Sequence, residues 1–109
     1  MRKTDAAAAF EALGDPNRRA ILEELRGGDR SVVELTRKLQ ISQPAVSRHL
    51  RLLREAGLVE GEPDGAKRLY RLRDEGADAV RSYIERLWGE SAVRFRLLAA
   101  NAARRPKKR

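Results

Sequence analysis

Apolar residues recur at helical spacing near the start of the chain and predict two short helices. The first is expected over residues 6–13 and ends at Gly14. Asp15-Pro16 then supplies an N-cap followed by proline in the first turn, which is a start signal for a second helix. Gly27-Gly28 closes this second helix, so the first quarter of the chain is expected to form a helical pair.

Two further helices follow, and only the three residues Gln40 to Ser42 separate them. Ser31 and Glu34 have the spacing of a capping box, so a third helix is expected to begin there. Ser42 is a good N-cap for a fourth helix, which ends at Gly57 and carries apolar residues on one face. Two helices joined by so short a turn form a helix-turn-helix, whose second helix enters the major groove of DNA.

After the fourth helix the pattern changes to two short extended runs. Residues 58–62 and 67–73 are typical of strands, and the turn residues Pro63, Asp64 and Gly65 lie between them. Alternation along the second run gives the predicted orientations: Tyr70 and Leu72 inward, Arg71 and Arg73 toward solvent. A hairpin directly after a helix-turn-helix is the wing of a winged helix. The sequence therefore predicts a mainly α-helical fold with a small β-hairpin, a winged helix-turn-helix.

The last third of the chain is expected to form one long helical stretch over residues 74–103. Gly89 weakens it locally by about 1 kcal/mol relative to alanine. A terminal helix this long exposes an apolar stripe that a small core cannot cover, so a second copy of the chain is expected to cover it. The residues expected at this dimer interface are Phe10, Val80, Ile84, Leu87, Trp88, Phe95 and Leu98. A ligand pocket lined by Tyr83 and Trp88 is the alternative to dimer packing.

The net charge of the chain indicates an anionic partner. The chain has 24 Lys and Arg against 16 Asp and Glu, a formal net charge of +8. Five of these charges belong to residues 104–109, which we expect to be a basic disordered tail that attracts phosphate without reading sequence. The remaining residues, 1–103, then form one DNA-binding and dimerisation domain. Within it, residues 27–57 sum to +3 and residues 58–73 to +1.

Composition excludes several classes of protein. The chain has no cysteine, which excludes disulfides, thiolate metal sites and cysteine nucleophiles. No apolar run approaches the roughly 20 residues of a membrane-spanning helix, and Glu11 interrupts the first run before it could serve as a secretory signal. No phosphate loop, metal cluster or acid–base pair at useful spacing indicates an enzyme. We therefore expect a cytoplasmic protein that is not an enzyme, with no cofactor and no membrane partner.

Two segments resemble the ArsR-type transcriptional regulators. Residues 10–19, FEALGDPNRR, are similar to the opening of that family. Residues 41–50, ISQPAVSRHL, continuing to LREAGLV at 53–59, are similar to its recognition-helix signature. The resemblance covers about residues 6–72. It implies a homodimeric winged-helix repressor whose first and last helices form the dimer interface.

Many members of that family sense metals, and here the sequence departs from the pattern. The positions at which arsenic- or cadmium-type sensors carry cysteines correspond to Ser31, Val33 and Thr36, none of which offers a thiolate. Zinc-type sensors use Asp, His and Glu ligands on the last helix, and no histidine follows His49. The resemblance therefore implies a repressor without the metal sites of the family, and its effector is unknown.

The outer face of the predicted recognition helix supplies candidates for reading bases. At about 100° per residue, Arg48 lies opposite the apolar stripe, and its planar guanidinium can pair with guanine. Gln43 can read adenine in a similar way, and Ser47 can contact bases or phosphate. Lys67 and Arg68 at the wing tip are expected to contact phosphates or the minor groove. The full expected set of DNA contacts is Ser42, Gln43, Pro44, Ala45, Ser47, Arg48, His49, Arg51, Lys67 and Arg68.

His49 is the one histidine of the chain, and its role stays open from the sequence. A half-buried structural side chain and a phosphate contact both fit its place at the border of the apolar stripe. A catalytic pair with Ser47 does not, because residues two apart on a helix do not face each other.

Three functions from different classes remain open. The leading hypothesis is a sequence-specific DNA-binding transcriptional regulator, a homodimeric repressor of its own or other genes. It would bind a pseudo-palindromic operator with recognition helices about 34–36 Å apart. The alternatives are a winged-helix protein-interaction module and a non-specific nucleoid-type DNA binder.

Overall fold

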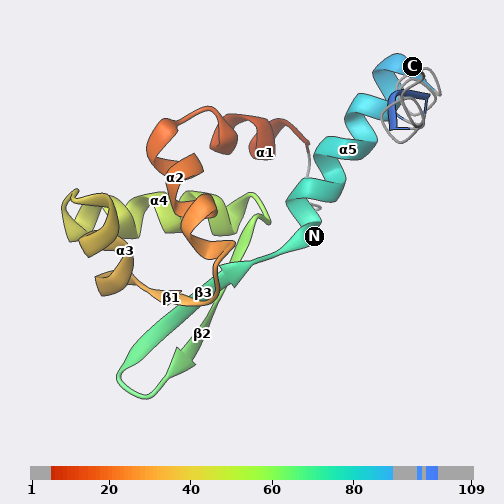
Figure 1. The fold of residues 1–109 in the computed structure, drawn as a ribbon. Helices are drawn as coiled ribbons and strands as arrows, with labels where there is room; N and C mark the ends of the chain where they lie inside the picture. The colour runs from red at the N-terminus through yellow and green to blue at the C-terminus, as the bar shows by residue number, and fades with distance from the viewer. Residues whose placement is uncertain (1–5, 90–95, 97, 101–109) are drawn as a thin grey trace, which may run out of the picture.

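The computed structural model describes residues 6–89, 96 and 98–100. Five helices and three strands are assigned in this part of the chain, and Figure 1 shows their arrangement. In chain order they are α1 (Ala6–Leu13), α2 (Pro16–Leu25), β1 (Arg30–Ser31), α3 (Val32–Leu39), α4 (Gln43–Glu55), β2 (Val59–Asp64), β3 (Lys67–Leu72) and α5 (Asp74–Trp88). The predicted mainly helical fold with a small wing is confirmed. The predicted basic tail and Phe95 lie outside the described residues.

Side-chain caps fix the first residues of three helices. The Asp15 carboxylate accepts hydrogen bonds from the amides of Asn17 at 2.7 Å and Arg18 at 3.1 Å, which starts α2. Ser31 and Glu34 form the complete capping box of α3. The Ser42 hydroxyl accepts from the Ala45 amide at 3.2 Å and starts α4. The predicted starts of all three helices are therefore confirmed, since each cap satisfies amides that have no partner within the helix.

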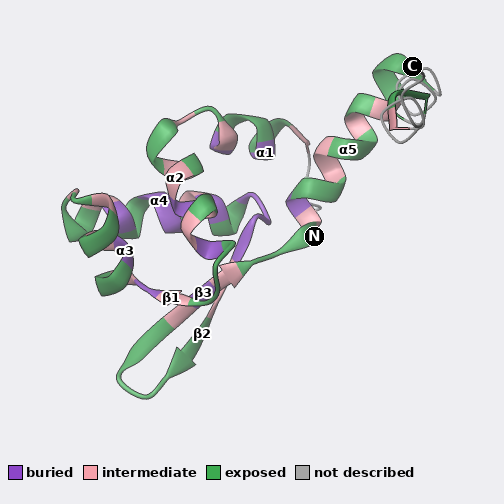
Figure 2. Cartoon of the chain, viewed as in Figure 1, coloured by how far each residue is buried: buried purple, intermediate pink, exposed green. Residues whose placement is uncertain are grey.

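The core is built around α4, which contacts α1, α2, α3 and β2. Val46, Leu50 and Leu53 project from one side of α4 and are fully buried. They belong to one buried cluster with Ile21 of α2 and Leu35 of α3. Figure 2 shows that burial is concentrated in α4 and at the base of the sheet, while the outer wing is exposed. The apolar face of the predicted recognition helix thus holds the domain together.

The sheet has three antiparallel strands in the order β1-β3-β2. Strand β1 was not predicted, because two residues carry no alternating pattern; its Ser31 pairs with Leu69 of β3. In the hairpin Asp64 pairs with Lys67, so the turn consists of Gly65 and Ala66. The turn predicted at residues 63–65 is therefore displaced toward the C-terminus. Pro63 is tolerated within β2 because β2 is an edge strand.

Two predictions for the side chains of β3 need correction. Tyr70 is buried as predicted, but Leu72 is 41% exposed, although its cross-strand partner Val59 is fully buried. Arg71 is on the opposite side from Tyr70, yet it does not simply face solvent. It forms salt bridges with three carboxylates, which are described below.

Helix α5 packs against α1 and then extends away from the remaining elements (Figure 1). The rings of Phe10 and Tyr83 meet edge to face with centroids 5.5 Å apart. The helical stretch predicted over residues 74–103 is interrupted at Gly89, the position expected to weaken it, which has φ 61° and ψ −147° and ends α5. Residues 96 and 98–100 are helical again. Among the described residues, the helices are too short or too polar to cross a membrane.

Candidate nucleic-acid interface

One face of α4 is exposed and polar, and it is opposite the face that forms the core. Gln43, Ser47, Arg48 and Arg51 are exposed along it. Pro44 is exposed beside them in the first turn, and Ala45 is half-buried. Exposure alone does not distinguish a binding face from a solvated one, so the interactions of its charged groups are decisive.

The cations of this face have no partners within the described part of the chain. The side chains of Arg48, Arg51, Lys67 and Arg68 make no hydrogen bond or salt bridge there. Several other arginines are engaged: Arg19, for example, donates to the Leu13 carbonyl at 2.8 Å. Within the described residues, Arg37 and Arg54 also make no side-chain hydrogen bond or salt bridge. The unengaged charges of α4 and the wing are therefore available to an anionic ligand.

A groove brings the start of α4 together with the wing tip. Gln43 lines it with Lys67 and Arg68, so three predicted DNA contacts from separate segments meet at one site. Arg37 of α3 lines the same groove, and sequence reasoning missed it. Its place in the last turn of the helix before α4 was the available signal. The groove thus presents three cations and one amide to a ligand.

Glu34 is the carboxylate that lines this groove, and it is occupied by the capping box. It accepts a hydrogen bond from the Ser31 amide at 2.8 Å, and that bond is the main reason why the pKa of Glu34 is lowered. The nearby charge of Lys67 lowers this pKa further. The lowered pKa keeps Glu34 ionised at neutral pH, so this groove carries one negative charge beside its three cations.

His49 belongs to the packing behind the exposed face. Its side chain is only 7% exposed, and Nδ1 lies 3.4 Å from Nη1 of Arg18. Burial lowers the pKa of His49, so the ring accepts from the guanidinium as a neutral imidazole. The structural interpretation of this residue therefore fits better than the phosphate contact.

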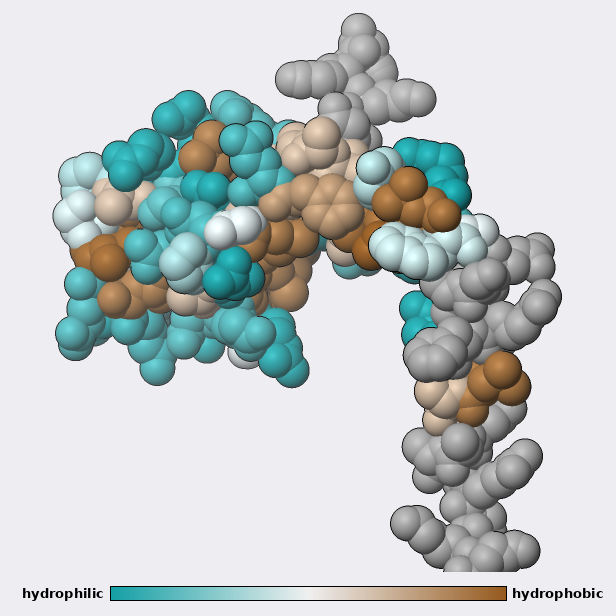
Figure 3. All heavy atoms as spheres, turned by 90° about the horizontal axis from the view of Figure 1, so that it is seen from above, coloured by the Kyte–Doolittle hydropathy of each residue, from teal (hydrophilic) through white to brown (hydrophobic). Residues whose placement is uncertain are grey.

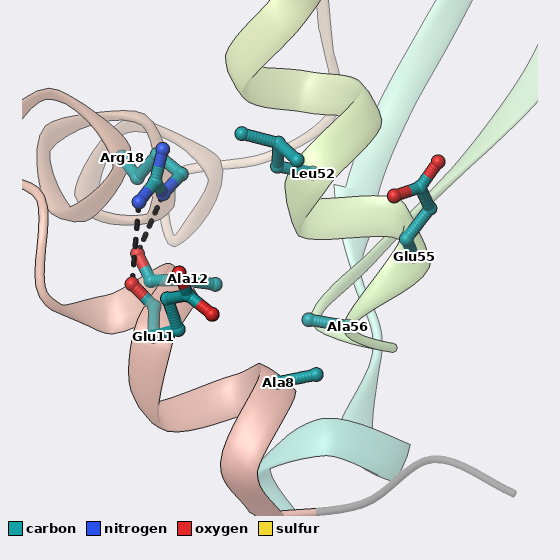
Figure 4. A pocket seen from close by; sticks show the side chains of 7 residues that line it. All are labelled: Ala8, Glu11, Ala12, Arg18, Leu52, Glu55 and Ala56. Carbon is teal, nitrogen blue, oxygen red and sulfur yellow. Dashed lines mark hydrogen bonds between the residues drawn. The ribbon is translucent and has the colours of Figure 1, made fainter.

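Arg18 connects three helices. Its Nε donates to the Ala12 carbonyl at 2.8 Å and its Nη2 to the Glu11 carbonyl at 3.2 Å, at the end of α1 (Figure 4). The third contact is the one to His49 of α4. A pocket of about 210 Å³ lies beside Arg18, between α1 and α4. Arg18 thus fixes α1 and α2 against the recognition helix.

The three positions that correspond to cysteines in metal sensors have other roles here. Ser31 caps α3, Val33 is an exposed side chain, and Thr36 has a buried hydroxyl without a hydrogen-bond partner. Within the residues that the structure describes, three or more His, Cys, Asp or Glu side chains do not gather in a way that could hold a metal.

The residues predicted at a dimer interface are mostly exposed apolar side chains of α1 and α5. Leu87 and Trp88 are each 58% exposed, and Phe10, Ile84 and Leu98 are exposed as well. Val80 differs, because it is half-buried against the core of its own chain. Figure 3 shows hydrophobic residues at the surface where α5 leaves the other helices. The structure therefore leaves an apolar surface on α5 uncovered.

A recognition helix with unpaired cations, preceded by a short helix and followed by a two-stranded wing, defines a winged helix-turn-helix DNA-binding protein. The family model for the bacterial regulatory protein, arsR family, matches residues 15–61. The chain is 46% identical over 80 residues to the HTH-type transcriptional regulator Rv2034 of Mycobacterium tuberculosis, covering 73% of this chain and 75% of that protein. The chain therefore belongs to the ArsR family and is a DNA-binding transcriptional regulator.

Two further comparisons agree with this assignment. The HTH-type transcriptional repressor SmtB of Mycobacterium tuberculosis is 46% identical over 69 residues, covering 63% of this chain and 51% of the repressor. The solved structure of an ArsR-like transcriptional regulator from Rhodococcus sp. RHA1 superposes with a TM-score of 0.71 at 31% identity, covering 92% of each chain. The resemblance seen in the sequence is thus confirmed in sequence and in fold.

Proposed function

We propose that this regulator represses transcription as a homodimer bound to a pseudo-palindromic operator, in the cytoplasm and without catalysis. The observation that carries the proposal is the exposed face of α4, where Arg48 and Arg51 have no partner among the described residues. A similar protein carries the name of transcriptional repressor, which supports repression as the outcome of DNA binding.

The exposed face of α4 would distinguish the bases. Residues around it would hold α4 in a fixed position along the DNA. Arg48 reads a guanine through its two-pronged guanidinium, and Gln43 reads a neighbouring adenine. Ser47 contacts a base edge or a phosphate from one turn beyond Gln43. Phosphate contacts set register without carrying sequence information. They come from Arg37, Lys67 and Arg68 around the groove, and from the exposed Ser42 and Arg51. Pro44 and the half-buried Ala45 offer only apolar contact, for example with a thymine methyl group.

The apolar surface of α5 supports the homodimer. Ile84, Leu87 and Trp88 are too exposed to contribute to the core of their own chain. Burying an apolar side chain of this size is worth about 1.5–3 kcal/mol, so a second copy would gain considerably from covering them. Two-fold symmetry would then place two copies of α4 in successive major grooves, about 34–36 Å apart.

Regulation without a bound metal is part of the proposal. The side chains at positions 31, 33 and 36 are a serine, a valine and a threonine, which do not supply the thiolates of arsenic-type sensors. Derepression would then depend on another signal.

Selection from a random duplex library with purified protein, followed by footprinting of the enriched sequence, tests the proposal. We expect a two-fold symmetric motif whose half-sites are one helical turn apart. Equal affinity for enriched and scrambled duplexes would instead indicate a nucleoid-type binder. No protection at any salt concentration would indicate a protein-interaction module.

A further inference from the structure

Arg71 of β3 joins three segments of the chain through its guanidinium. Nη1 lies 3.2 Å from Oε2 of Glu60, its cross-strand neighbour on β2, and Nη2 lies 2.6 Å from Oε1 of Glu62 on the same strand. Nη2 also lies 3.3 Å from Oδ2 of Asp29, in the loop before β1. One side chain therefore connects both strands of the wing to the segment that leads into α3.

The wing has little other support on its outer half. Residues 62–68 are all exposed, and β1 pairs with β3 at only two positions, Arg30 with Tyr70 and Ser31 with Leu69. An isolated two-stranded hairpin is marginally stable in water. The direction in which the wing projects is therefore set near its base, where Arg71 lies.

We propose that Arg71 is a positioning residue for DNA binding, which holds the wing so that Lys67 and Arg68 face the same groove as Gln43. The proposal rests on the function proposed above, because it concerns how that interface is assembled. The contact with Asp29 carries the proposal, because Asp29 is two residues before Ser31, the N-cap of α3. Through this contact Arg71 links the wing to the helix-turn-helix as well as bridging its two strands.

The charges of the cluster exclude a simpler role for Arg71 as a phosphate contact. Three carboxylates surround one guanidinium, so the cluster is net negative and Arg71 is already engaged on both of its terminal nitrogens. The hydrogen bonds that Arg71 donates to Glu62 and Glu60 raise its pKa above the ordinary value. Without the guanidinium, the carboxylates would repel one another and the strands would separate. An ammonium group lacks the planar fork needed to reach three carboxylates at once.

The test compares Arg71→Gln and Arg71→Lys with the wild type. Each protein is titrated with a fluorescent random-sequence duplex of about 30 base pairs at about 50 to 200 mM NaCl. Both variants should bind this duplex about five- to twentyfold more weakly. The slope of log K against log salt concentration should become shallower by the amount expected for about one to two lost phosphate contacts. Arg73→Gln is the matched control, because it removes the same charge close to the wing. The salt-bridge partner of Arg73 is Glu75 of α5, at 2.8 Å, so Arg73 does not join the two strands of the wing. We expect it to change affinity by about twofold or less.

A double-mutant cycle separates positioning from direct contact. In a Lys67→Gln, Arg68→Gln background the Arg71→Gln change should have no further effect, because the wing tip through which it acts is already neutral. Additive losses would overturn the proposal and make Arg71 a contact in its own right. Wild-type affinity in Arg71→Lys would also overturn it, since charge alone would then suffice. Urea unfolding of each variant verifies that the loss does not come from unfolding.

The same experiment distinguishes this inference from the proposed function. If the wild type shows no preference for any sequence, the proposed operator binding is wrong. The affinity for the random duplex still shows whether Arg71 positions the wing, because that measurement does not depend on sequence preference. Conversely, an enriched operator that binds wild type and both Arg71 variants equally would overturn only the role of Arg71.

Discussion

The amide of Gly76 donates a hydrogen bond of 2.8 Å to the carbonyl of Gly57, and this contact joins the first turn of α5 to the end of α4. A second backbone bond, from the Arg73 amide to the Leu58 carbonyl at 2.9 Å, lies beside it. A Cβ at Gly76 would lie 2.5 Å from the Ala56 carbonyl oxygen. The helix that carries the uncovered apolar surface, α5, is thus attached by backbone hydrogen bonds to the end of α4, the helix proposed to face DNA.

Gly76→Ala should destabilise the domain despite the better helix propensity of alanine. Propensity favours alanine by up to about 1 kcal/mol, but the new methyl group meets a backbone oxygen that cannot rotate away. Overpacking of this kind costs about 1–3 kcal/mol, so we expect a lower free energy of unfolding in urea. Ser82→Ala, at an exposed position of α5, is the control and should be neutral. A Gly76→Ala variant as stable as wild type would show that α5 can shift on α4.

Arg48→Ala should cost about 1–3 kcal/mol of binding on the selected operator and relax the preference at one base position. The reason is the loss of a bidentate contact to a base edge. Competition binding with single-base operator variants measures both effects. Arg54→Ala, an exposed cation of the same helix, should lower affinity for all duplexes alike. If Arg48→Ala weakened operator and scrambled duplex equally, Arg48 would be a phosphate contact.

Leu87→Glu should dissociate the proposed homodimer. Leu87 is 58% exposed, so the substitution places a charge in the interface while leaving the core of the chain intact. Sedimentation equilibrium should show a monomer, and operator affinity should fall because two linked half-sites become one. The matched control is Ser82→Glu, which adds the same charge elsewhere on α5. A dimer that persists in Leu87→Glu would place the interface on another surface.

The pKa of His49 predicts a dependence of stability on pH. Burial lowers this pKa below the ordinary value of 6.5, helped by Arg18 and Arg48 and opposed by Asp15. Below about pH 6.5 the unfolded chain therefore takes up a proton that the folded chain resists, and stability falls as the pH falls. We expect wild type to lose more stability than His49→Gln between about pH 7.5 and 5.5, measured by urea unfolding. Parallel profiles would mean that His49 does not titrate differently in the two states.

Local signals predicted most of the helical fold. The caps at Asp15, Ser31 and Ser42 act within three residues of where they stand in the sequence, so the helix starts could be read directly. Periodicity identified the buried face of α4 for the same reason. The turn was misplaced because Pro63 is a typical turn residue, and only the sheet order shows that its strand is an edge.

The features that were missed depend on contacts between distant residues. Asp29 and Arg71 are 42 positions apart, and no pattern in either segment indicates their pairing. The strand β1 is too short to show alternation, and its pairing with β3 brings the two segments together. Arg37 joins the groove because α3 and the wing tip are neighbours in space. His49 could be placed at the border of the apolar face, but only the position of Arg18 shows what its ring contacts.

The division of α4 into two faces also bears on how such a regulator could evolve. Gln43, Ser47 and Arg48 contribute nothing to the buried cluster, whereas Val46, Leu50 and Leu53 make up much of it. If the outer face reads the operator as proposed, substitutions on it can change the preferred sequence without a loss of folding stability. Substitutions on the inner face can then vary among apolar residues without changing the operator. A duplicated copy of this gene could acquire a new target through a few replacements, with its fold and the apolar surface of α5 unchanged.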